Sequence, residues 1–263
     1  MIYVLIALVC FIATLTGSIC GMGGGIIIKP VLDSLKIMDA STISFLSGCT
    51  VLAMSTYSVA EARISKKSEI DPKTGTVLAI GAAVGGIVGK QLFNMVKAGL
   101  SDASRVGFIQ AICMLILTAL CLIYSFVKGR IRPLKITNPV ISAVIGLLLG
   151  LMSAFLGIGG GPVNVTILYL LFSMKPKEAA QNSLYIILFC QLFSLIWSLI
   201  THTVPAFYPS MLLLMAAAGI IGSITGRLIN RKIENGTVSV LFRVLMIVII
   251  LINIYNIVQP FIR

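Results

Sequence analysis

Long stretches without a charged residue run through most of the chain. They cover residues 1–28, 40–60, 106–127, 136–174, 179–226 and 244–262. A helix that crosses a bilayer needs about 20 apolar residues, so each stretch can cross at least once. The pattern predicts an all-α integral membrane protein that crosses the bilayer many times.

Glycines, prolines and short polar turns divide these stretches into ten expected helical elements. In the first half they are 3–20, 24–38, 42–60, 75–97 and 106–127. In the second half they are 139–158, 162–174, 181–200, 207–227 and 238–258. About eight of them are full spans. The other two, 24–38 and 162–174, each follow a run of glycines and are expected to belong to broken helical hairpins.

Composition agrees with a membrane protein and excludes other classes. The chain has 58% hydrophobic and 11% charged residues and a mean hydropathy of +1.08, whereas a soluble domain carries about 25% charged residues. The net charge of +12 lies in loops and forms no basic tail or aromatic platform, so we expect no nucleic-acid partner. The six cysteines form no C-x-x-C pair and are expected to be small buried hydrophobic residues.

The chain repeats itself. The sequence G-M-G-G-G at 21–25 returns as G-I-G-G-G at 157–161, an offset of 136, and G-x-x-x-G-K at 85–90 returns as G-x-x-x-G-R at 222–227, an offset of 137. Two homologous halves of this kind indicate an internal duplication. We therefore divide the chain into a first transmembrane repeat at 1–127, a basic cytoplasmic linker at 128–138 and a second transmembrane repeat at 139–263.

The distribution of Lys and Arg decides between two topologies. If each glycine-rich element turns back, 13 of the 20 Lys and Arg lie on one side of the membrane and 4 on the other, whereas a straight passage gives 9 and 8. Cytoplasmic loops carry an excess of Lys and Arg, so we expect hairpins, inverted repeats and both termini outside the cell membrane. Lys29, Lys90 and Arg243 lie within the expected spans.

The two glycine runs are the leading candidates for a binding site. Consecutive glycines can adopt positive φ and bring backbone N–H groups close to a ligand, and a helix N-terminus carries about half a positive charge. Breaks at corresponding positions of two halves are typical of transporter sites, and this chemistry suits a small oxyanion. The candidates are Gly23, Gly24, Gly25, Gly159, Gly160 and Gly161.

Close helix packing is the alternative role for these glycines. For the G-x-x-x-G series, packing is the favoured role, either within one chain or between the chains of a homodimer. That series comprises Gly81, Gly85 and Gly89 in the first half and Gly219, Gly222 and Gly226 in the second.

The second glycine run continues as G-I-G-G-G-P at 157–162 and is followed by K-P-K-E-A-A-Q-N-S at 175–183. The doubled glycine element and this Pro-x-Glu-Ala stretch leading into Asn-Ser resemble the sulfite exporter TauE/SafE family. The first half lacks the Pro and Glu but keeps Ser47 in register with Ser183. The resemblance covers nearly the whole chain and implies transport of small sulfur oxyanions or organosulfonates, with other small organic acids also used by members.

Polar residues close to the glycine runs complete the candidate site. Ser47, Gln181, Asn182 and Ser183 are expected to add hydroxyl and amide donors, with helix capping as the alternative for Asn182 and Ser183. Asn164 lies two residues after Pro162 and is a further candidate, with Thr166 as a possible one. Lys29 is a possible cation for the substrate; the alternatives are snorkelling to the interface and pairing with Asp33 one turn later.

These observations favour a secondary carrier or permease of small anions that works by alternating access and needs no cofactor or metal. Its expected partners are a small anionic substrate and the lipid bilayer. Two other classes stay open. One is an intramembrane thiol redox enzyme that uses the cysteines, and the other is a membrane scaffold that transports nothing.

Overall fold

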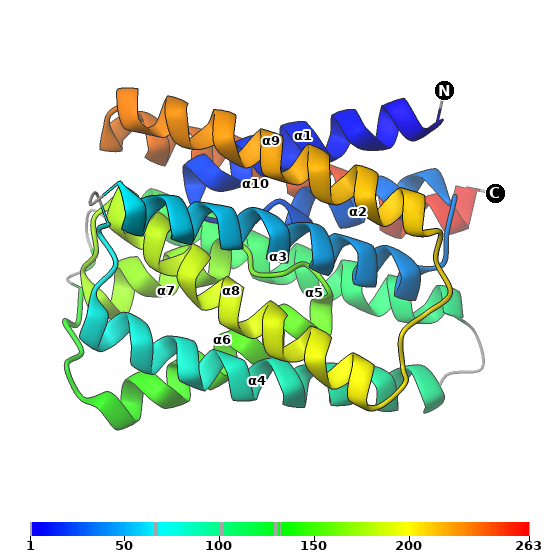
Figure 1. Ribbon diagram of the computed structural model, residues 1–263, viewed down its shortest axis with the longest axis horizontal. Coiled ribbons are helices and arrows are strands. Elements are labelled where there is room, and N and C mark those ends of the chain that lie inside the picture. Colours follow the sequence, from blue (N-terminus) through cyan, green and yellow to red (C-terminus); the bar gives the residue numbers. More distant parts are fainter. Residues whose placement is uncertain (1, 66–67, 100–102, 129–130, 132, 263) are drawn as a thin grey trace.

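The computed structural model describes residues 2–65, 68–99, 103–128, 131 and 133–262. Within these residues the chain forms ten α-helices and no strand (Figure 1). Eight of the ten described helices are long and apolar enough to cross a membrane. The all-α class and the eight spans expected from the sequence are thus confirmed.

The first repeat supplies five helices in chain order. They are α1 Ile2–Cys20, α2 Gly25–Leu35, α3 Ala40–Ile64, α4 Pro72–Gly99 and α5 Ala103–Val127. The second repeat supplies α6 Pro139–Leu156, α7 Pro162–Phe172, α8 Pro176–Ile200, α9 Pro209–Lys232 and α10 Asn235–Ile262. The same order of long and short helices appears in both repeats, with α2 corresponding to α7.

The short helices α2 and α7 have 11 residues each. At 1.5 Å per residue they extend about 16 Å, roughly half of a hydrocarbon core. Each ends at a residue with left-handed backbone, Lys36 with φ of 50° and Ser173 with φ of 56°. Such a residue stops a helix, so neither α2 nor α7 is long enough to cross the hydrocarbon core.

Each repeat packs its helices against the other repeat. Helix α4 packs along α6, and at the corresponding place α9 packs along α1. Glycines make this possible: a Cβ on Gly85 would collide with the Leu147 carbonyl, and one on Gly222 would lie 2.5 Å from the Phe11 carbonyl oxygen. The G-x-x-x-G series therefore packs helices, as expected, and it does so within one chain, the first of the two alternatives that the sequence left open.

The two chain ends lie at the same end of the molecule, and α3 begins at that end as well (Figure 1). Since α1 starts there too, α2 runs back toward the end from which α1 came. Six of the cations in the charge count, Lys66, Lys67, Arg105, Arg130, Arg132 and Arg263, lie outside the residues whose side chains the structure describes.

Candidate functional site

The two glycine turns begin with the same backbone conformation. Gly21 and Gly157 have φ of 73° and 66°, and Gly23 and Gly159 have φ of 66° and 65°. These left-handed values are disfavoured for residues with a side chain. The repeated sequence thus produces a repeated turn at the end of α1 and of α6.

The turns differ where their short helices begin. In the first turn Gly24 has helical φ and ψ of −70° and −20° and leads directly into α2. In the second turn Gly160 has φ of 120° and Gly161 has φ of 147° and ψ of −175°, so the chain is extended before α7. Pro162 is the reason, because a residue before proline is driven out of the helical region.

The two turns lie against each other in the interior of the molecule. A Cβ added at Gly25 would collide with the carbonyl group of Ile158. A Cβ at Gly23 would lie 3.0 Å from the carbonyl oxygen of Gly159. The backbones of the two repeats therefore approach as closely as only glycine permits, and this brings the six candidate glycines into one region.

The middle parts of α3 and α8 flank the crossing turns. Val51 of α3 and Ile187 of α8 both contact the Gly23 position, and Gln191 of α8 lies beside Gly159. Ser47 is fully buried, its Oγ lies 2.9 Å from the Cβ position of Gly25, and this hydroxyl has no hydrogen-bond partner. An unpaired hydroxyl thus faces the N-terminus of α2.

Ser183, the repeat counterpart of Ser47, has a different environment. Its Oγ donates a hydrogen bond of 2.5 Å to the carbonyl oxygen of Gly21. The hydroxyl therefore holds the first glycine turn against α8. The structure places Ser183 beside the glycine turns, as a residue that fixes one of them.

Gln181 and Asn182 lie farther along α8 toward its N-terminus, and their amides bind a loop. The Gln181 Oε1 accepts from the Glu69 N–H at 3.0 Å. The Asn182 Oδ1 accepts from the Asp71 N–H at 3.2 Å, and its Nδ2 donates to the Glu69 carbonyl at 3.0 Å. These amide groups anchor residues 69–71, and the structure does not turn them toward the glycines.

The candidate residues on the short helices α2 and α7 have different surroundings. Asn164 and Thr166 are buried within α7, and Thr166 lies beside Cys121 of α5. Lys29 of α2 is only 2% exposed, and its Nζ forms an ion pair of 2.9 Å with Asp33 one turn later. Its charge is therefore neutralised within α2, as the pairing alternative expected.

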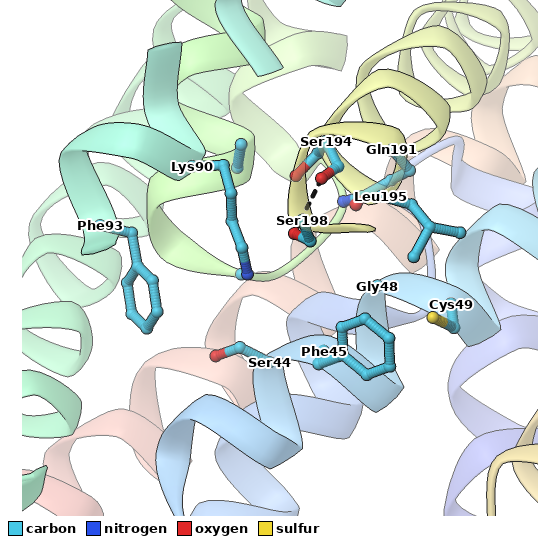
Figure 2. A pocket seen from close by; sticks show the side chains of 12 residues that line it. Ser44, Phe45, Gly48, Cys49, Lys90, Phe93, Gln191, Ser194, Leu195 and Ser198 are labelled. Atoms are coloured by element: carbon cyan, nitrogen blue, oxygen red, sulfur yellow. Dashed lines mark hydrogen bonds between the residues drawn. The ribbon is translucent and has the colours of Figure 1, made fainter. Parts of the chain in front are cut away.

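A cavity of about 30 Å³ adjoins the second glycine turn. Figure 2 shows Lys90 reaching from α4 into the space between Ser44 of α3 and Ser198 of α8. Gly157 and Gln191 also line this space. The hydroxyl of Ser44 and the Nε2 of Gln191 are buried without a hydrogen-bond partner, so the cavity offers donors that the protein leaves unused.

Lys90 is 9% exposed and lies over the ring of Phe93, with its Nζ 5.3 Å from the ring centroid. Among the described residues, no carboxylate forms an ion pair with it. Sequence reasoning placed Lys90 within a span but did not single it out. The signal was available, since a lone cation in a span is expensive and marks function by default.

An ion cluster lies at the end of the molecule opposite the chain termini. Glu61, near the end of α3, accepts from the Nε of Arg227 at 2.5 Å and is also bound by Arg231. Ser223 is hydrogen-bonded to both Ser18 and Ser58, at 3.0 and 2.7 Å. The C-terminal ends of α3 and α9 lie opposite the chain termini (Figure 1), so polar contacts join α1, α3 and α9 on that side.

Comparisons with known proteins agree with this architecture. Residues 6–253 match the family described as sulfite exporter TauE/SafE. The chain is 25% identical over 278 residues to the "Probable membrane transporter protein YunE" of Bacillus subtilis (strain 168), covering 95% of this chain and 96% of that protein. No solved structure matches. A family match over nearly the whole of a multi-pass chain shows that this protein belongs to the sulfite exporter TauE/SafE family of membrane transporters.

Proposed function

We propose that the protein is a secondary carrier of small anions in the cell membrane, with sulfite and related sulfur oxyanions or organosulfonates as the leading substrates. The observation that carries this proposal is the crossing of the two glycine turns. They come from different repeats, touch through their backbones, and have unpaired donors of Ser44, Ser47 and Gln191 around them.

The chemistry around the turns favours an anion. Helices α2 and α7 both begin at the turns, and a helix N-terminus attracts negative charge. The unpaired hydroxyl and amide groups are donors that an oxyanion can use. Irregular backbone inside a membrane is tolerated where protein buries it or where it lines a wet cavity, which is the situation of both turns.

Alternating access between inverted repeats is part of the proposal. The equivalent packing of α4 on α6 and of α9 on α1 supports it, as does the start of α3 at the same end of the molecule as the start of α1 (Figure 1). In the hairpin topology most Lys and Arg lie in loops on the side away from the termini. Cytoplasmic loops carry the excess of Lys and Arg, so the end with the termini is the outside in this proposal. Rocking of one packed unit against the other would expose the turns to each side in turn.

A panel of anions tests the substrate. Purified protein is heated with sulfite, sulfate, thiosulfate, taurine, sulfoacetate or acetate, and the unfolding temperature is measured. A ligand at 100 times its Kd adds about 2.7 kcal/mol to the free energy of unfolding, so we expect a clear rise for at least one sulfur anion.

The matched variants are Gly160→Ala and Gly236→Ala. Gly160 has positive φ, and its Cβ would lie 2.5 Å from the Cγ1 of Ile187, whereas a Cβ at Gly236 meets nothing within 4 Å. The ligand-induced rise should vanish in the first variant and persist in the second. A rise that survives in Gly160→Ala would place the site elsewhere. No rise with any anion would favour a scaffold that transports nothing.

A further inference from the structure

We propose that Lys90 supplies the positive charge that binds the substrate, and that only one of the two repeats contributes such a charge because Glu61 neutralises its counterpart. The site then takes a small oxyanion that carries no ammonium group. This inference rests on the proposed function and names the substrate class for the same central region.

The internal repeat gives Lys90 an equivalent residue in the second half of the chain. Gly85 and Gly89 correspond to Gly222 and Gly226 at an offset of 137, so the next residue, Lys90, corresponds to Arg227. Both cations follow directly after the last glycine of a packing face, on helices α4 and α9. They occupy equivalent positions in the two repeats.

The partners of these two cations differ. Arg227 is bound to the carboxylate of Glu61 on α3, at 2.5 Å. Helices α3 and α8 correspond at an offset of 136, so the counterpart of Glu61 on α8 is Trp197. The indole Nε1 of Trp197 donates to the Oε1 of Gln91 at 3.3 Å. The second repeat thus has no carboxylate where the first has one.

The missing carboxylate leaves the Lys90 ammonium in the cavity. Ser198, the residue after Trp197, lines the cavity together with Ser44 and Ser194. Figure 2 shows the ammonium group pointing into the space between α3 and α8. A buried cation without a counter-charge is unfavourable, and an oxyanion bound here would occupy the place that Glu61 takes beside Arg227.

The cavity also restricts the kind of anion. Its volume of about 30 Å³ holds roughly two water molecules, so it favours a compact head group. Among the described residues that line it, none is acidic. The ammonium of a zwitterion such as taurine would find no carboxylate there and would be repelled by Lys90.

Equilibrium binding of radiolabelled sulfite to the full-length purified protein tests this inference. We expect Lys90→Met to weaken binding at least about tenfold, since removal of one partner of a desolvated charge pair costs at least this much. Lys90→Arg keeps the charge and should retain binding. Lys97→Met removes an exposed cation from the same helix and should bind like the wild type.

Ser198→Glu is the second, independent variant. It places a carboxylate one residue from the counterpart of Glu61, where it can pair with Lys90 and compete with the substrate. We expect lost sulfite binding in a protein whose unfolding temperature without ligand is not lower than that of the wild type. A merely structural Lys90 would instead give a lower unfolding temperature in this variant with unchanged affinity.

Competition with taurine tests the restriction on the substrate class. Excess taurine should not displace sulfite from the wild type.

The outcomes separate this inference from the proposed function. If the wild type binds sulfite and both Lys90→Met and Ser198→Glu bind it equally well, Lys90 is not the counter-charge, although the carrier proposal stands. Displacement of sulfite by taurine overturns the restriction on the substrate class. If the wild type binds no anion by this assay or by the panel, the proposed function itself fails.

Discussion

Gly25→Ala should give a large loss of stability. Its Cβ would collide with the Ile158 carbonyl and lie 2.6 Å from the Ile158 carbonyl carbon. Both sides of this contact are backbone, so neither can move aside without separating the two turns. Overpacking a core costs about 1–3 kcal/mol, and we expect the upper end of that range. The measurement is thermal unfolding of the purified variant.

Gly107→Ala is the matched control. Gly107 lies in α5, and an added Cβ there would make an ordinary contact of 3.5 Å with the Cβ of Ala40. Alanine also has the higher helix propensity, so this variant should unfold at the wild-type temperature or slightly above it. If Gly25→Ala behaves like this control, the two turns do not pack as closely as described.

Glu61→Gln is also expected to lower the free energy of unfolding. The substitution leaves Arg227, which is 11% exposed, without a carboxylate, and it also removes the partner of Arg231. Breaking a buried ion pair costs about 3–5 kcal/mol, and an exposed pair contributes at most about 1 kcal/mol. For this partly buried cluster we expect a loss of about 1–3 kcal/mol.

Hydrogen exchange locates this second effect. The C-terminal ends of α3 and α9 should exchange faster in Glu61→Gln, while α6 should be unaffected. Glu69→Gln is the control, because the Glu69 side chain is exposed and this residue binds Gln181 and Asn182 through its backbone. Equal protection of α3 and α9 in wild type and Glu61→Gln would show that the ion cluster does not hold this end together.

Much of the fold follows from local sequence signals. Apolar length predicts the eight spans, and the repeated glycine run predicts the two breaks, because both depend on residues that are neighbours in the chain. The start of α7 illustrates this, since Pro162 and the glycines before it fix both the helix start and the extended turn. The G-x-x-x-G spacing likewise indicates tight packing.

Partners in space could not be read from the chain. The spacing of Gly85 and Gly89 does not say that α6, from the other repeat, covers them. Asn182 directly precedes Ser183 in α8, so their side chains leave the helix only about 100° apart, yet the amide of Asn182 binds the loop at 69–71. The isolation of Lys90 is also a property of packing, because it depends on where Glu61 and Trp197 lie relative to the two cations.

Solute counterflow tests the central claim, carriage of a small anion by alternating access, most directly. Proteoliposomes are loaded with unlabelled sulfite, diluted into a trace of radiolabelled sulfite, and sampled over time. A carrier exchanges the two pools, so we expect the label to rise transiently above its equilibrium level in loaded vesicles with wild type and Gly236→Ala, but not with Gly160→Ala. Label that only equilibrates, with no transient excess for any anion of the panel, would contradict the claim.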